Sequence, residues 1–183
     1  MKSLFVFIWE ILKLVIIALL IVIPIRYFIF QPFFVRGQSM EPNFENGDYL
    51  IVEELSFRFR EPQRGEVVVF KCPQVPSQRH IKRIVGLPGE TITVEDNKII
   101  ISKDSQSWIL DETNYLPAST YTQPRKFKTL TLKEGEYFVL GDNRGNSTDS
   151  RLWGPLPEEN IIGRVIFRVL PFTAFAKIEA PEY

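Results

Sequence analysis

The 183-residue chain is poor in the residues that build disulfides and metal sites, with one cysteine and one histidine. Cys72 alone excludes an internal disulfide, and with His80 it is too little for a zinc site of the His/Cys type. Basic and acidic residues number 22 each, so no global charge favours nucleic acid. No basic run interleaved with aromatics is present either. We therefore expect no metal, no cofactor and no nucleic-acid partner.

Apolar residues concentrate near the N-terminus, where residues 14–25 read LVIIALLIVIPI. Alone this run is shorter than the roughly 20 residues that a membrane span requires. Lys13 and Arg26 flank it, and long basic side chains can extend toward water and lengthen the usable span. Trp9, further upstream, suits a membrane interface. The sequence predicts a membrane anchor at 1–26, with a transmembrane helix at roughly 6–26.

Two other structures compete for this segment. A cleaved signal peptide has the same layout of charge followed by apolar residues, but no small-x-small cleavage site precedes Arg26. A buried core helix is disfavoured because apolar residues cover every face of 14–25. Charge counting is a weak guide to orientation: Lys2 and Lys13 favour a cytoplasmic N-terminus, whereas Arg26 and Arg36 oppose it.

The remainder of the chain has short β-type segments and no sustained helical period. Residues 27–35 are expected to form an edge strand because Pro32 interrupts them, and Asp96-Asn97 is expected to turn a hairpin. Residues from about 102 to 129 are rich in Ser, Thr, Asp and Pro and are expected to be irregular. An apolar stretch at 165–178 is too interrupted for a second span and predicts a core strand with a docked tail. The other expected strands are 49–53, 66–70, 80–85, 91–94, 98–101, 130–132, 137–140 and 161–170.

A single serine, Ser39, stands in the polar turn Gly37-Gln38-Ser39-Met40-Glu41-Pro42. A hydroxyl is a poor nucleophile unless a neighbouring base removes its proton. Side chains alternate along a strand, so Lys82 shares a face with Ile84. Burial lowers the pKa of a lysine and can make it a general base near neutral pH. The ordinary alternative is a solvated strand lysine.

A second polar block follows at residues 141–151 (GDNRGNSTDSR). Such a block is usually a surface turn, and Asn146-Ser147-Thr148 also matches the short N-glycosylation pattern. Carboxylate–guanidinium contacts would make the loop rigid, and Ser147 would then be placed to hydrogen-bond the base. The candidates for those contacts are Asp142, Asp149, Arg83 and Arg151.

Together these segments resemble the bacterial type I signal peptidases, which are membrane-anchored Ser/Lys endopeptidases. The resemblance covers roughly residues 26–165, with the motifs in the family's order. The matching stretches are Ser39-Met40-Glu41-Pro42, Gly47-Asp48, residues 64–70 (RGEVVVF), residues 82–90 (KRIVGLPGE), Gly141-Asp142-Asn143-Arg144, Ser147, Asp149-Ser150-Arg151 and Gly154.

The resemblance implies a role for each matching position. Ser39 is expected to be the nucleophile, Lys82 the general base and Ser147 the group that orients the lysine amine. Charge pairs among Arg83, Asp142, Asp149 and Arg151 are expected to support the site. The Ser39 backbone N–H is expected to form the oxyanion hole.

Five further residues are expected around the site. Gly37 stands where some members have a serine hydroxyl as a second oxyanion donor, so a backbone N–H or water is the alternative donor. His80 shares the face of Lys82 and is an alternative base, but we favour a role in the wall of the substrate groove. Apolar walls of the pockets for small residues are expected from Met40, Phe44 and Ile81.

The resemblance implies an antiparallel coiled β-sheet catalytic domain at 27–183 with a smaller subdomain inserted at about 95–133. The expected activity is removal of signal peptides from exported preproteins after an Ala-x-Ala pattern, through an acyl-enzyme. The protein is expected to be a monomer in the plasma membrane, contacting lipid, with one span and an extracytoplasmic catalytic domain. A self-cleaving repressor with the same chemistry would need a DNA-binding head, and a catalytically silent membrane-anchored β module would tolerate Ser39→Ala.

Overall fold

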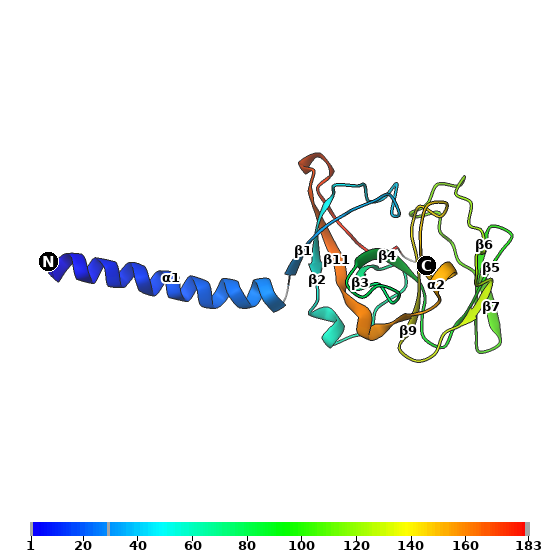
Figure 1. Ribbon diagram of the computed structural model, residues 1–183, viewed down its shortest axis with the longest axis horizontal. Coiled ribbons are helices and arrows are strands. Elements are labelled where there is room, and N and C mark those ends of the chain that lie inside the picture. The colour runs from blue at the N-terminus through cyan, green and yellow to red at the C-terminus, as the bar shows by residue number, and fades with distance from the viewer. Residues whose placement is uncertain (1, 29, 182–183) are drawn as a thin grey trace.

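The computed structural model describes residues 2–28 and 30–181, and it divides into one long helix and a β-sheet body (Figure 1). Helix α1 (Lys2–Phe28) extends away from the sheets. Side chains from Leu4 to Val22 that the structure describes are exposed on every side. Among the described residues, no helix combines the length and hydropathy required to cross a membrane, so the predicted span is not confirmed.

The change from helix to strand falls slightly later than the sequence predicted. Tyr27 and Phe28 continue α1 instead of starting an edge strand, and their side chains, like that of Arg26, lie outside the described part. Strand β1 (Phe30–Phe34) then pairs with β2 (Tyr49–Glu53). Pro32 is tolerated because β1 is an edge strand, where a missing N–H removes no ladder hydrogen bond on the open side.

The larger sheet has eight strands in the order β1-β2-β11-β3-β4-β9-β10, with β12 paired to β11. Its pairings are antiparallel, which confirms the predicted mostly β, antiparallel fold. The remaining bounds are β3 (Val67–Lys71), β4 (Arg79–Gly86), β9 (Glu136–Leu140), β10 (Leu156–Pro157), β11 (Ile161–Leu170) and β12 (Ala176–Lys177). Short helices are η1 (Ser56–Arg58), α2 (Ser150–Trp153), η2 (Glu158–Asn160) and η3 (Phe172–Ala174).

The smaller sheet has the order β7-β6-β5-β8 and lies at the opposite end of the body from α1 (Figure 1). Its strands are β5 (Thr91–Glu95), β6 (Lys98–Lys103), β7 (Gln106–Ile109) and β8 (Thr129–Thr131). Asp96 and Asn97 both have positive φ, as a two-residue hairpin turn requires, so the predicted hairpin is confirmed. Strand β7 was missed because its four side chains are all exposed and give no alternation.

Strand β4 occupies the middle of the larger sheet and sets the position of the site. It pairs with β3 along residues 79–83, whereas its ladder with β9 begins at Arg83 opposite Leu140. Residues 81–86 are buried on both faces, so β4 is held by apolar packing as well as by its ladders. Apolar clusters lie around it, one including Val35, Leu50, Val69 and Ile81 and another including Val68, Phe70 and Ile84.

Candidate active site

Ser39 stands on a turn between β1 and β2 whose backbone is fixed on both sides. Gly37 has a φ of +88°, a conformation that favours glycine, and its N–H donates to Oδ1 of Asn46 at 2.9 Å. After the serine, the Phe44 N–H donates to the Met40 carbonyl at 3.0 Å. Ser39 itself is half-buried. Its backbone N–H makes no hydrogen bond to any described residue, so this donor is available to a ligand.

Lys82 on β4 reaches this serine directly. Its Nζ lies 2.7 Å from Ser39 Oγ and 2.7 Å from the Ile81 carbonyl oxygen. The residue is 3% exposed, and Ile84 on the same face is fully buried. Burial lowers the pKa of Lys82 from 10.5 to about 8, although the carboxylates of Asp149 and Asp142 oppose this shift. A substantial fraction of the amine is therefore neutral at mildly alkaline pH.

Arg83, the next residue on β4, points to the other face and forms a buried ion pair. Its Nε and Nη2 donate to the two carboxylate oxygens of Asp142 at 2.9 and 2.7 Å, and its Nη1 donates to the Gly65 carbonyl at 2.9 Å. Asn43 Nδ2 also donates to Asp142 at 2.8 Å. This network ties the serine turn, β4 and the 141–151 loop together.

Asp149 and Arg151 form a second ion pair within the 141–151 loop, and both are 0% exposed. Nε and Nη2 of Arg151 donate to the Asp149 carboxylate at 2.9 and 2.8 Å. The Gly141 N–H donates to the same carboxylate at 3.2 Å. The loop thus satisfies these two buried charges from within itself.

The loop also holds the serine turn. The Asn143 N–H donates to the Ser39 carbonyl at 3.0 Å, and its Nδ2 donates to the Gln38 carbonyl at 3.0 Å. A Cβ at Gly141 would collide with that Ser39 carbonyl and with Ser147 Oγ, so only glycine permits this approach. The structure therefore brings Ser39, Lys82 and the loop residues into one assembly.

Ser147 lies in this assembly, but no hydrogen bond joins it to Lys82. Its Oγ is buried and has no partner among the described residues. The position beside Gly141 and the Ser39 carbonyl places the hydroxyl near the dyad. Its expected role in orienting the lysine amine stays a prediction, since the bond that would perform it is not formed here.

A groove of about 830 Å³ opens over Ser39 and Lys82. Ile81 and His80 line it, whereas Met40 and Phe44, which were expected as pocket walls, lie in the apolar cluster with Ile81, at 1% and 2% exposure. The other lining residues are Phe33, Phe34, Arg36, Gly37, Gln38, Asn46, Arg79, Asn146 and Thr148. An apolar residue next to a nucleophile suits either a pocket or the core, and sequence alone did not separate the two.

His80 contacts the groove but not the nucleophile. Its Nε2 lies 3.4 Å from Gln78 Oε1, its ring packs edge-on against Phe70, and burial together with the nearby Lys82 charge lowers its pKa. Lys82 is the basic group that touches Ser39 Oγ. Among the described residues, no set of three His, Cys, Asp or Glu side chains is arranged to hold a metal ion.

Sequence reasoning missed a third buried charge pair. Arg144 is fully buried, and its guanidinium donates to Glu112 at 2.9 and 2.5 Å and to Thr122 Oγ1 at 2.9 Å. Its Nε donates to the Gly141 carbonyl at 3.0 Å. Arg144 was in a matching stretch, but its partners lie in the 102–129 region, where no pattern marked them.

The model of the family described as "Signal peptidase, peptidase S26" matches residues 8–170. "Probable signal peptidase I-1" of Synechocystis is 37% identical over 179 residues, covering 94% of this chain and 87% of the relative. "Signal peptidase I" of Leptolyngbya laminosa is 33% identical, covering 93% and 83%. "Signal peptidase I V" of Bacillus subtilis is 35% identical, covering 81% and 90%.

A solved structure of a signal peptidase I from Enterococcus faecalis is 33% identical and covers 57% of this chain and 97% of its own, with a TM-score of 0.47. The family model spans most of the chain, including Ser39, Lys82 and the 141–151 loop. The resemblance expected from the motifs is confirmed, and the chain belongs to the signal peptidase family, peptidase S26.

Proposed function

We propose that this serine endopeptidase of the signal peptidase family removes signal peptides by means of a Ser39–Lys82 dyad. The observation that carries the proposal is the 2.7 Å contact between Lys82 Nζ and Ser39 Oγ, made by a buried lysine whose pKa is lowered to about 8. A neutral amine at this distance can accept the hydroxyl proton, which is the geometry that a general base requires. The activity itself follows from the family and from relatives named signal peptidase I.

The substrate is proposed to bind as an added strand. Residues 79–82 of β4 pair with β3 on one side, while pairing with β9 begins only at Arg83, so the groove-side edge of 79–82 is open within the described chain. The groove is bounded on its other side by residues 33–39. An extended peptide placed between them can hydrogen-bond to this edge and pass its carbonyl over Ser39.

The reaction then proceeds in two steps. Lys82 takes the proton of Ser39 Oγ as the oxygen attacks the scissile carbonyl, and the same amine returns the proton to the departing amino terminus. Water activated by Lys82 hydrolyses the resulting ester and releases the signal peptide. The Ser39 backbone N–H is proposed to stabilise the oxyanion, with a second backbone N–H or a water as the other donor, because Gly37 has no hydroxyl. Cleavage after an Ala-x-Ala pattern is part of this proposal.

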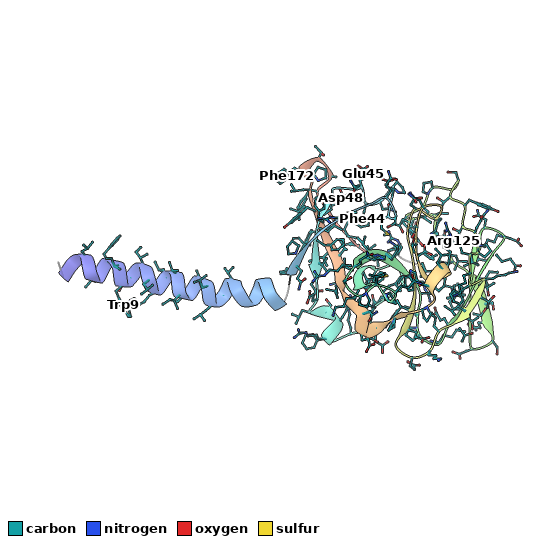
Figure 2. The ribbon with its side chains drawn as sticks, viewed as in Figure 1. Trp9, Phe44, Glu45, Asp48, Arg125 and Phe172 are labelled. Atoms are coloured by element: carbon teal, nitrogen blue, oxygen red, sulfur yellow. The ribbon has the colours of Figure 1, made fainter. Side chains whose placement is uncertain are left out.

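Helix α1 is proposed as the membrane anchor, with a cytoplasmic N-terminus and an extracytoplasmic catalytic domain. This proposal is supported by the exposed apolar side chains on the helix, such as Phe7, which is 63% exposed, and Leu20, which is 69% exposed. Figure 2 shows that Trp9 projects from α1 where no other element lies beside it. Alkaline extraction of membranes tests the attachment, and deletion of residues 1–26 should release the protein. Protease protection of an N-terminal tag in intact cells tests the orientation.

The dyad is tested with a detergent-solubilised precursor bearing an Ala-x-Ala site. Wild type should cleave at that site, and Ser39→Ala and Lys82→Ala should each lower kcat by about 10⁴-fold or more. His80→Ala is the matched control, since this residue lines the groove without touching Ser39 Oγ. Cleavage that survives Lys82→Ala but not His80→Ala would move the base to the histidine, and activity unaffected by Ser39→Ala would remove the dyad altogether.

A further inference from the structure

The C-terminal tail carries the cleavage triplet expected in the proposed substrate. The five alanines of the sequence stand at 18, 118, 174, 176 and 180, so Ala174-Phe175-Ala176 is its single Ala-x-Ala triplet. Residues 165–170 before it read VIFRVL, with one charge, and Pro171 separates them from the triplet. These residues are fewer than the roughly 7–15 of a signal peptide's apolar region and include Arg168, so the likeness to a signal peptide is confined to the triplet.

Phe175 of this triplet is exposed, whereas Ala174 and Ala176 are half-buried, and the triplet lies in short secondary structure. Phe172 and Phe175 are 81% and 61% exposed, and Figure 2 shows Phe172 at the tip of the hairpin that follows β11. Strand β12 has two residues and forms two pairs with β11, Lys177 opposite Phe167 and Ala176 opposite Arg168. Short terminal strands at a surface open more readily than the core.

The contacts that must break for the tail to become extended include the stacked rings of Phe167 and Phe175 and two turn hydrogen bonds, from the Ala174 and Phe175 N–H groups to the Pro171 and Phe172 carbonyls. Arg168 Nε donates to the Ala174 carbonyl at 2.8 Å, and the Ile178 N–H donates to the Ile166 carbonyl at 2.8 Å. Ile178 packs against the apolar cluster from a half-buried position. The Lys177–Glu179 ion pair is exposed and holds residues within the tail only. Opening therefore leaves β11 and the Ser39–Lys82 site in place.

The tail does not occupy the groove of its own chain, because the described residues that line the groove end at Thr148. Given the proposed function, we propose that the Ala176–Lys177 bond is a self-processing site, cleaved in the groove of a second copy of the chain. In this pose Ala176 supplies the scissile carbonyl and Ala174 lies two residues before it, as the Ala-x-Ala pattern requires.

The bond changes balance with water as the one further reactant. Ser39 Oγ of the cleaving copy forms an ester with the Ala176 carbonyl carbon, and the bond from that carbon to the Lys177 nitrogen breaks. The hydroxyl proton passes through Lys82 Nζ to the Lys177 nitrogen, which leaves as a new amino terminus. Water hydrolyses the ester, leaving a carboxylate at Ala176 and a free Ser39. The products are a chain ending at Ala176 and the peptide 177–183.

The test uses full-length ¹⁵N-labelled Ser39→Ala protein as substrate and unlabelled wild-type protein as enzyme, both in detergent micelles. Mass spectrometry follows the labelled peptide, because the wild-type chain carries the same residues 177–183. We expect release of peptide 177–183 from the Ser39→Ala chain only when wild type is added. Ala176→Phe in the substrate chain should slow release at least about tenfold, whereas Ala180→Phe, outside the triplet, should not. Misfolding of the tail would speed cleavage, so slower release reports recognition of the triplet.

A precursor with an Ala-x-Ala site is included in every reaction. If wild type cleaves that precursor while the tail of the Ser39→Ala chain stays intact, self-processing is overturned and the proposed function stands. Cleavage of the tail at another bond, or equal release from the Ala176→Phe chain, also overturns it. If wild type cleaves neither, the proposed function fails and the inference fails with it.

Discussion

The two polar loops of this protein both carry Asp, Asn, Ser, Thr and Arg, but their burial is opposite. Residues 141–151 are mostly buried, and Asp149 and Arg151 are 0% exposed. Residues 111–128 are mostly exposed, with Tyr121 at 60%. In residues 141–151, Asp149 pairs with Arg151 of the same loop and Asp142 pairs with Arg83 on β4. Residues 111–128 supply Glu112 and Thr122, which accept hydrogen bonds from Arg144 of the 141–151 loop.

The comparison shows that pairing of charges, and not polarity, decides whether such a segment can be buried. Taking a charge out of water is costly unless an opposite charge and hydrogen bonds replace the solvent. The 141–151 loop meets this condition and can therefore pack beneath the serine turn and the dyad. Substitutions that break one charge pair should therefore lower the free energy of unfolding most where the pair is most buried.

The largest effect is expected at Asp142, the partner of Arg83 beneath the site. Asp142→Ala removes the carboxylate that accepts two hydrogen bonds from the buried guanidinium. Removing one partner of a buried pair typically costs about 3–5 kcal/mol. Denaturant unfolding of the Asp142→Ala protein measures this loss, and Glu95→Gln, which breaks the exposed pair with Lys128, is the control with no measurable change expected. Equal effects of the two substitutions would contradict the distinction between the loops.

The second effect concerns Lys82 and the pH dependence of stability. The folded lysine loses its proton near pH 8 and the unfolded one near 10.5, so between these values the unfolded chain binds more protons. Stability therefore rises with pH across this window. Below about pH 8 the destabilisation caused by burying the charged amine no longer changes with pH. Relative to Lys82→Met, wild type should gain about 3 kcal/mol between pH 8 and 10.5. Parallel stability curves for the two proteins would show that Lys82 titrates normally.

A smaller effect is expected where the exposed loop meets the buried one. Glu112→Gln weakens the charge-assisted bonds to Arg144, a fully buried residue, and should cost about 1–3 kcal/mol. Glu134→Gln is the matched control, because Glu134 is exposed, lies in a turn and forms no ion pair with any described residue. Unfolding curves that coincide for the two variants would show that the 111–128 loop contributes nothing to the site's support.

The smallest effect on stability is expected at Ser147. Ser147→Ala removes a buried hydroxyl that has no partner among the described residues, so the free energy of unfolding should change by less than about 1 kcal/mol. If Ser147 orients the Lys82 amine in the substrate complex, kcat should nevertheless fall by about 10²-fold. Ser147→Thr, which keeps the hydroxyl, should recover part of the rate. Unchanged kcat in Ser147→Ala would remove the positioning role.

The sequence predicted the strands that alternate and the contacts that follow from them. Lys82 and Ile84 were expected on one face, and the structure buries both. The partners of Arg144 were not predictable, since Glu112 and Thr122 lie 32 and 22 positions away, in a segment without periodicity. Met40 and Phe44 pack in the apolar cluster with Ile81, and their expected place in the pocket walls stays a prediction. Apolar side chains next to a nucleophile can face a groove or the core, and the sequence does not separate the two.

The central claim is that Lys82 serves as the base for Ser39, and the pH dependence of single-turnover precursor cleavage tests it most directly. The account predicts a rate that rises with pH through one apparent pKa near 8, the value to which burial lowers that of Lys82, with the same profile in His80→Ala. A rate that rises only near the ordinary lysine pKa of about 10.4 would contradict it. So would a profile near pH 6.5 that disappears in His80→Ala.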